Sequence, residues 1–93
     1  MESKLQNMVN LLNEKYGNDK REYSFTEANK YFKVWVKSWG QTSIYAFVDR
    51  EGNIYKPAGC NAPAKHVRGH VDEPLKCCGE YGVNYLRMRE YNV

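Results

Sequence analysis

Apolar side chains recur at helical spacing near the start of the chain and form one face of a predicted helix over residues 3–16. Ser3 and Gln6 match a capping box, in which each side chain satisfies a free backbone N–H at the helix start. Gly17 follows the last turn, where a left-handed residue often ends a helix. The apolar face consists of Leu5, Met8, Val9, Leu12 and Tyr16.

The middle of the chain changes to the period-two alternation of β-strands. Phe32, Val34 and Val36 alternate with larger polar and aromatic residues and make the more natural core face of a strand. Gly52 can take positive φ at the end of a hairpin loop, and Pro57 ends the pairing of the strand that follows. The pattern predicts antiparallel strands at residues 31–39, 43–48 and 53–56, and residues 23–26 could begin a further short strand.

The pattern changes again after Gly59. Asn61 is a suitable N-cap, Pro63 falls in the first turn after it, and Gly69 stands just past the end. These signals predict a short helix or 3₁₀ turn over residues 62–68.

Beyond this point residues 72–82 read as a loop, and residues 83–91 alternate like a fourth strand, with a helix as the alternative. The expected fold class is α+β: an N-terminal helix packed on a three- to four-stranded antiparallel sheet, with a short helical insert after the third strand. We expect a single domain over residues 1–93. The pattern leaves open the strand order and which sheet face the helix covers.

Composition supports a folded protein that acts inside the cell. Hydrophobic residues make up 42% of the chain, and eight Tyr, three Phe and two Trp supply much of the packing area. No apolar run is long enough to span a membrane and the polar N-terminus does not read as a signal peptide, so we expect a cytoplasmic protein without membrane contact. In that compartment Cys60, Cys77 and Cys78 are expected as reduced thiols.

Charge draws attention to the segment from Tyr55 to Val71, YKPAGCNAPAKHVRGHV. It contains three cations, both histidines and no acid, and therefore accounts for the whole net charge of +3. On the predicted helical turn Lys65 and Arg68 share a face, and backbone N–H groups near Gly59 could point outward toward a phosphate. The alternative is a solvated loop packed by its alanines. The predicted ligand-binding residues are Lys56, Lys65 and Arg68 for phosphate, Tyr55 and Trp39 for stacking, and His66 and His70 as hydrogen-bond donors.

A second candidate surface is the strand face formed by Tyr31, Lys33, Trp35, Lys37 and Trp39. Alternating rings and cations suit a surface on which unpaired bases stack while lysines meet phosphates. Two alternatives stay open: an interface with a host protein or a second copy of the chain, since interfaces favour Trp and Tyr, and packing beneath the helix.

All cysteines and histidines of the chain lie within a short stretch, and zinc takes thiolate and imidazole ligands. Their spacing contains no C-x-x-C pair, so a zinc module is a minor alternative and we predict no metal or other cofactor. Cys60 with a histidine could form a thiolate–imidazole pair, but no P-loop or GxGxxG accompanies it, and we predict a protein that is not an enzyme. The residues concerned are Cys60, His66, His70, Cys77 and Cys78.

The run from Ile54 to Gly69 resembles a segment of small uncharacterised proteins of tailed bacteriophages, in which an IYKxA strand end precedes an APAKxxRG loop. The resemblance covers about a fifth of the chain. It implies a viral accessory protein in the host cytoplasm that binds host factors, nucleic acid or defence components. Those proteins often carry an aromatic residue where Cys60 stands, which counts against a metal role for Cys60. The function expected is therefore binding of nucleic acid or a nucleotide, with a protein–protein module as the alternative.

Overall fold

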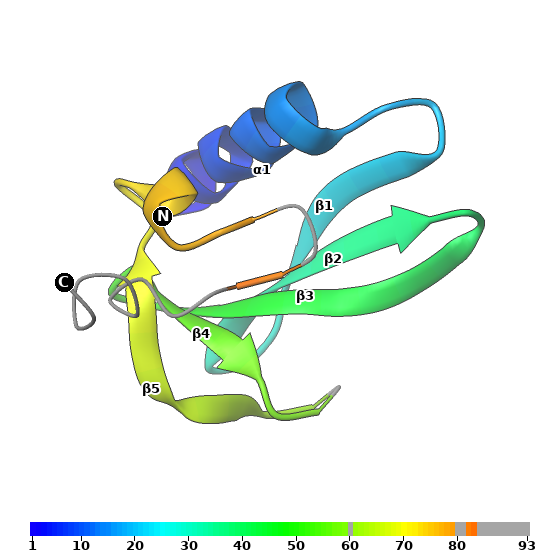
Figure 1. The fold of residues 1–93 in the computed structure, drawn as a ribbon. Coiled ribbons are helices and arrows are strands. Elements are labelled where there is room, and N and C mark those ends of the chain that lie inside the picture. The colour runs from blue at the N-terminus through cyan, green and yellow to red at the C-terminus, as the bar shows by residue number, and fades with distance from the viewer. Residues whose placement is uncertain (60, 80–81, 84–93) are drawn as a thin grey trace, which may run out of the picture.

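The computed structural model describes residues 1–59, 61–79 and 82–83 and has one helix against a sheet of five antiparallel strands, in the order β1-β2-β3-β4-β5 (Figure 1). The predicted α+β class, the N-terminal helix and the antiparallel meander are confirmed, and the sheet has more strands than the three or four expected. The elements are α1 (Glu2–Tyr16), β1 (Arg21–Glu27), β2 (Tyr31–Ser38), β3 (Gln41–Asp49), β4 (Asn53–Pro57), β5 (Pro63–His70) and the 3₁₀ helix η1 (Pro74–Lys76).

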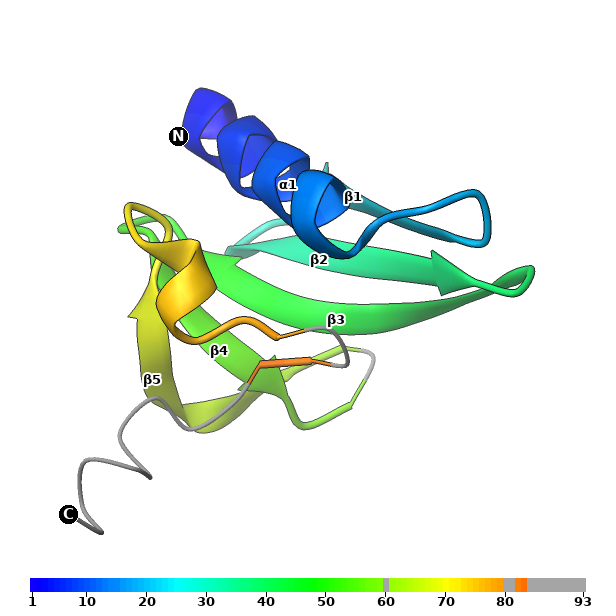
Figure 2. The same cartoon turned by 45° about the horizontal axis from the view of Figure 1, so that its top comes forward.

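Helix α1 and η1 lie on the same side of the sheet (Figure 2). Phe32 and Val34 of β2 point to that side and are buried, which confirms the core face predicted from their alternation. The aromatic and lysine side chains of β2 therefore lie on the opposite face of the sheet, which we call the outer face. The helix-side core is built from Leu5, Met8, Val9, Leu12, Tyr23, Phe32, Val34, Tyr45, Ala46, Val48, Ile54, Val71, Cys77, Cys78 and Val83.

The two ends of α1 differ from their predicted caps. The helix begins at Glu2 with Met1 as its N-cap and no side-chain cap bond, so Ser3 already lies inside the helix and the predicted capping box is wrong. Gly17 has an extended backbone, at φ −73°, and not the left-handed conformation. Its role is steric, because a Cβ at this position would lie 2.5 Å from the carbonyl oxygen of Asn13.

Asn13 joins the helix to the sheet. Its side-chain oxygen accepts the backbone N–H of Tyr23 at 2.8 Å, and its amide nitrogen donates to the carbonyl oxygen of Tyr23 at 3.0 Å. One amide side chain thus satisfies both polar backbone groups of a residue on β1. Because β1 is an outer strand of the sheet, these groups would otherwise face away from any neighbouring strand.

The predicted helix at residues 62–68 is wrong, because this segment forms β5. Local signals for a cap and a first turn are outweighed by pairing with β4, which satisfies the backbone groups in another way. Pro63 is tolerated as the first residue of a strand at the sheet edge, where its missing N–H costs little. Gly69 lies against Cys77, whose Sγ would be 2.5 Å from an added Cβ.

Strand β5 contains a bulge at Arg68. Val67 pairs with Tyr55 and Gly69 pairs with Ile54, so two consecutive residues of β4 face partners that are two positions apart. Arg68 is the extra residue between them. Its side chain is 8% exposed, whereas that of Val67 is 51% exposed.

The segment after β5, which the sequence predicts as a loop, contains η1. Most of the predicted fourth strand at residues 83–91 lies outside the described residues; Val83, its first member, forms an isolated bridge with Cys78. Among the described residues no helix is long and apolar enough to cross a membrane.

Candidate functional site

The corner between β4 and β5 keeps part of the predicted basic surface. The backbone N–H groups of Ala58 and Gly59 both donate to the carbonyl oxygen of Ala62, at 3.0 and 3.3 Å. They are therefore occupied within the turn and do not form the outward-facing phosphate cradle expected from a helix start. The basic and histidine side chains that lie exposed at this corner are Lys56, Lys65 and His66.

Arg68 does not join Lys65 on a common side, and this prediction is wrong. The expectation required a helical turn, in which residues three apart share a face. In the structure this segment is a strand with a bulge at Arg68, and Lys65 is exposed while Arg68 is buried. Arg68 is thereby removed from the predicted phosphate-binding surface.

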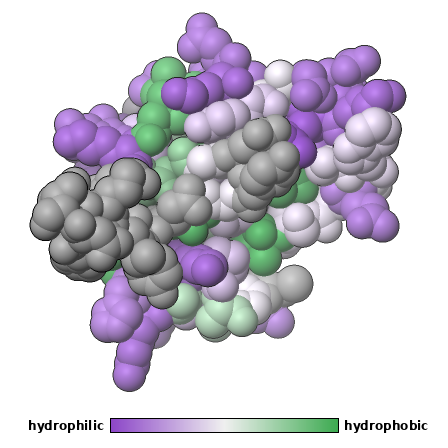
Figure 3. Space-filling view, in the orientation of Figure 1, coloured by the Kyte–Doolittle hydropathy of each residue, from purple (hydrophilic) through white to green (hydrophobic). Residues whose placement is uncertain are grey.

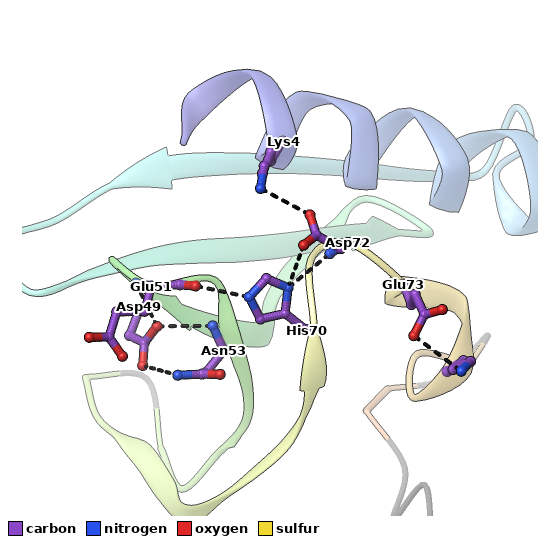
Figure 4. Close-up of polar contacts among 8 residues, drawn as sticks. Lys4, Asp49, Glu51, Asn53, His70, Asp72 and Glu73 are labelled. Carbon is purple, nitrogen blue, oxygen red and sulfur yellow. Dashed lines mark hydrogen bonds and ion pairs between the residues drawn. The ribbon is translucent and has the colours of Figure 1, made fainter.

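His70 is engaged within the fold (Figure 4). Its Nδ1 accepts the backbone N–H of Asp72 at 3.1 Å, which leaves Nε2–H to donate to the carbonyl oxygen of Glu51 at 2.9 Å. Asp72 also forms an ion pair with Lys4 of α1 at 3.1 Å. His70 therefore connects β5 to the β3–β4 turn and, through Asp72, to α1. Both ring nitrogens, predicted to donate to a ligand, are already engaged.

Tyr55 lies on the outer face, where its hydroxyl donates to Oδ2 of Asp49 at 2.9 Å. Partial burial and this bond to the carboxylate raise the pKa of Tyr55 to about 12. Its ring packs edge-on against Tyr31 at 6.2 Å between centroids. Tyr55 is thus a supporting part of the outer face, and its hydroxyl is already bonded to Asp49.

Asp49 organises the β3–β4 turn by accepting several hydrogen bonds (Figure 4). Partial burial opposes its ionisation, but bonds from Asn53, Tyr55 and Glu51 outweigh this and lower the pKa of Asp49. The donors are the backbone N–H groups of Glu51 and Asn53, the side-chain amide of Asn53 and the hydroxyl of Tyr55.

We expect Asp49→Asn to destabilise the protein in a pH-dependent way. A carboxyl whose folded pKa is lowered stabilises the fold above its unfolded pKa of about 3.9 and loses this effect as pH falls through the folded value. The melting temperature of the variant should therefore lie below that of the wild type near pH ~7 and approach it near pH ~2. An equal difference at both pH values would assign the loss to packing instead of charge.

The outer face of β2 presents rings and cations beside one another. The indole N–H of Trp35 donates to Oγ1 of Thr26 on β1 at 2.9 Å, which fixes the ring across the sheet. The Nζ of Lys33 lies 5.8 Å from the centre of that ring and 5.9 Å from the centre of Phe47. Lys37, two residues after Trp35 on the same strand, is exposed. Tyr31, at the start of the strand, packs edge-on against Phe47 at 5.8 Å.

Trp39 does not continue the strand as predicted but occupies the turn between β2 and β3. Trp39 and Gly40 have φ values of +54° and +82°, between the paired residues Ser38 and Gln41, which is the pattern of a type I′ hairpin turn. The indole is 74% exposed. Bulky residues at positive φ are genuine outliers, and such strain gathers at functional positions.

The α1–β1 loop brings further cations to this turn. The Nζ of Lys20 lies 4.8 Å from the centre of the Trp39 ring, and the Trp39 backbone N–H donates to the Lys20 carbonyl oxygen at 2.9 Å. Lys20, Arg21 and Lys37 line an open cleft of about 550 Å³, together with acidic and amide side chains of the same loop. In Figure 3 the end of the molecule where β2 and β3 turn shows pale atoms among hydrophilic, purple ones. The complete lining is Asn13, Gly17, Asn18, Asp19, Lys20, Arg21, Glu22, Lys37 and Gly40.

We call one set of side chains the ring–cation surface. It combines the outer-face rings and lysines of β2 with Trp39 in the β2–β3 turn and Lys20 beside it. Sequence reasoning found most of its members but missed Lys20, because residues 18–22 read only as a polar loop. The adjacent cations at 20 and 21 were the available signal, and nothing local placed them beside Trp39. The surface consists of Lys20, Tyr31, Lys33, Trp35, Lys37 and Trp39.

Two of the cysteines lie in the core on the helix side. The Sγ atoms of Cys77 and Cys78 are 3.7 Å apart, and both are free thiols. The hydrogen bond with Cys77, together with burial, raises the pKa of Cys78, so that its thiol stays protonated. Among residues 1–59, 61–79 and 82–83 no group of three or more His, Cys, Asp or Glu side chains is placed to hold a metal ion. Cys60 lies outside these ranges.

The fold and its exposed surface define a small α+β protein with one helix on a five-stranded antiparallel meander and a face of rings and lysines on the other side. The chain belongs to a family of unknown function, DUF7717, which matches residues 1–77. That match includes every helix and strand from α1 to η1. Comparisons with curated proteins and with solved structures gave no match.

Proposed function

We propose that this protein binds nucleic acid, a phosphate-bearing polymer, through the ring–cation surface. In this proposal the protein acts by binding and not by catalysis. The observation that carries the proposal is the state of Trp39. Its indole is 74% exposed, it sits at φ +54°, and the ammonium of Lys20 lies 4.8 Å from its ring.

The conformation of Trp39 is unfavourable, and its exposed side chain contributes little to the stability of the fold. Burying a large side chain would stabilise the protein by about 1.5–3 kcal/mol, and an indole left mostly in water gains only a fraction of this. Positive φ adds a cost of about 1–2 kcal/mol for a residue with a Cβ. An exposed aromatic residue held in a strained turn beside cations is better explained by contact with a ligand than by packing.

The lysines of the surface suit phosphate. Lys20 and Lys37 are exposed, and a lysine ammonium serves as a mobile point charge for a phosphate group. Glu22 on β1 lies opposite Lys37 on β2 in the strand register and reduces the positive charge locally. The remaining charge and the adjacent rings fit a polymer that offers phosphates and bases at regular intervals.

A pair of matched variants tests the location. Lys20→Ala/Lys37→Ala and Lys56→Ala/Lys65→Ala each remove two positive charges from exposed positions, the first pair at the ring–cation surface and the second at the β4–β5 corner. We expect the first pair to weaken binding of mixed-sequence oligonucleotides more strongly, and to reduce the salt slope by about 0.7–0.9 for each phosphate that the variant no longer binds. Titrations by fluorescence anisotropy at several salt concentrations measure both effects.

Two results would count against the proposal. Equal weakening by both pairs would mean that the protein attracts nucleic acid by net charge alone. No binding by the wild type at about 50 mM salt, where non-specific binders still hold their ligand, would remove nucleic acid altogether.

The second candidate function is a protein–protein module, favoured by the same exposed Trp39, because interfaces are enriched in Trp and Tyr. Its partner would be a host or defence protein, or a second copy of the chain. The resemblance of residues 54–69 to phage proteins agrees with either function in the host cytoplasm, and the free thiols Cys77 and Cys78 suit that reducing compartment. A monomeric mass in solution, with no partner recovered from infected cells, would contradict this alternative.

A further inference from the structure

The layout of the ring–cation surface goes further than phosphate binding and indicates the form of the nucleic acid; the inference rests on the proposed function. Trp35 lies on β2 and Trp39 lies in the turn that follows Ser38, so the Cα atoms of the two residues are at most about 13 Å apart. Lys37 stands between them, and Lys33 lies beside Trp35. Rings and charges thus alternate along this part of the chain.

Indole rings on an open sheet face bind bases by stacking, and stacking requires a free base face. In a duplex each base is stacked on its neighbours, and only base edges are accessible in the grooves. Unpaired bases can be splayed out and stacked on aromatic side chains. Trp35 is suited to this, because its bond to Thr26 holds the ring in place before a ligand arrives.

The shape of the hairpin end argues against reading a duplex. A two-stranded β-ribbon can enter the major groove, which is about 12 Å wide. Here β1 pairs with β2 as far as Arg21 opposite Ser38, so three strands reach the end that carries Trp39. With strands about 4.8 Å apart, three backbones alone span about 10 Å before any side chain is added. This end is too broad to enter the groove.

We infer that the ligand is single-stranded nucleic acid, with one unpaired base stacked on Trp35 and another on Trp39, while Lys20, Lys33 and Lys37 contact the phosphates. Stacking tolerates any base, and lysine contacts to phosphates carry no direct sequence information. The surface therefore binds with little sequence preference.

Tryptophan fluorescence tests this directly, because Trp35 and Trp39 are the two tryptophans of the chain. Trp35→Phe and Trp39→Phe each keep an aromatic ring and leave one reporter. Oligothymidine of about 12 nucleotides, within the range of known site sizes, is titrated against each protein and compared with a duplex of the same length. We expect quenching of both reporters by the single strand, and an affinity at least about tenfold higher than for the duplex, given the usual strength of base–aromatic stacking.

Three results would overturn the inference, and they separate it from the proposed function. The duplex could bind as tightly as the single strand or more tightly, while Lys20→Ala/Lys37→Ala still binds more weakly than the wild type. In that case the protein binds phosphates but has no specificity for single strands. Binding of the single strand without quenching of either tryptophan removes the stacking. Binding of neither nucleic acid at about 50 mM salt removes the proposed function as well.

Discussion

Trp39→Asn is expected to lower the affinity for single-stranded oligonucleotides by roughly 5- to 150-fold, the effect of removing one base–aromatic stack. The same change should leave the protein as stable as before or stabilise it by up to about 1 kcal/mol, because asparagine tolerates positive φ far better than a bulky residue. The cation–π interaction with Lys20, which the substitution removes, contributes only about 0.5–1 kcal/mol at an exposed site. Thermal unfolding and anisotropy titration measure the two effects on one sample.

Val67→Asn provides the matched control. Val67 is another well-exposed large hydrophobic residue, at 51%, and it lies on β5 outside the ring–cation surface. Its replacement should leave oligonucleotide affinity unchanged. A Trp39→Asn protein that melts at a lower temperature and binds as well as the wild type would instead make Trp39 a residue that stabilises the hairpin.

The largest loss of stability is expected from Gly52→Ala, compared with Gly40→Ala. Both glycines have positive φ, +92° and +82°, so each alanine carries a backbone cost of about 1–2 kcal/mol. A Cβ at Gly40 meets nothing within 4 Å, whereas at Gly52 it would lie 2.7 Å from Nε2 of His70 and 2.9 Å from a methyl group of Val71. Because both nitrogens of His70 are engaged, its ring cannot move aside without breaking these bonds.

The overlap at Gly52 adds about 1–3 kcal/mol to the backbone cost. For a domain of this size, the total corresponds to a melting temperature about 10–30 °C lower for Gly52→Ala. Gly40→Ala should be clearly less destabilised, and calorimetry of the two variants under the same conditions measures the difference. Similar decreases in both would show that backbone conformation alone makes these glycines necessary.

Much of the fold could be predicted from sequence because its signals are local. The apolar face of α1 and the alternation in β2 depend only on the period of each element, and both were predicted correctly. Strand β5 was missed because its local signals, Asn61 and Pro63, favour a helix start, while the pairing that decides its structure comes from β4. Propensity is a weak prior, and tertiary context overrides it here.

The same difference between local and long-range signals applies to the candidate site. The alternation of rings and lysines on β2 could be predicted, since neighbouring positions of one strand fix it. The burial of Arg68 could not, because it follows from a bulge defined by the register between two strands. Nor could the approach of Lys20 to Trp39, which requires the α1–β1 loop to fold back against the β2–β3 turn.

The hydrogen bonds of Asn13 have a consequence for how this protein meets other chains. An unpaired sheet edge invites strand addition by peptides and aggregation with further copies. On β1 the amide of Asn13 occupies both backbone groups of Tyr23, and on β5 Pro63 and the bulge at Arg68 interrupt the regular row of donors and acceptors. Both edges are thereby poor templates for another strand, and recognition is left to the faces and turns of the sheet.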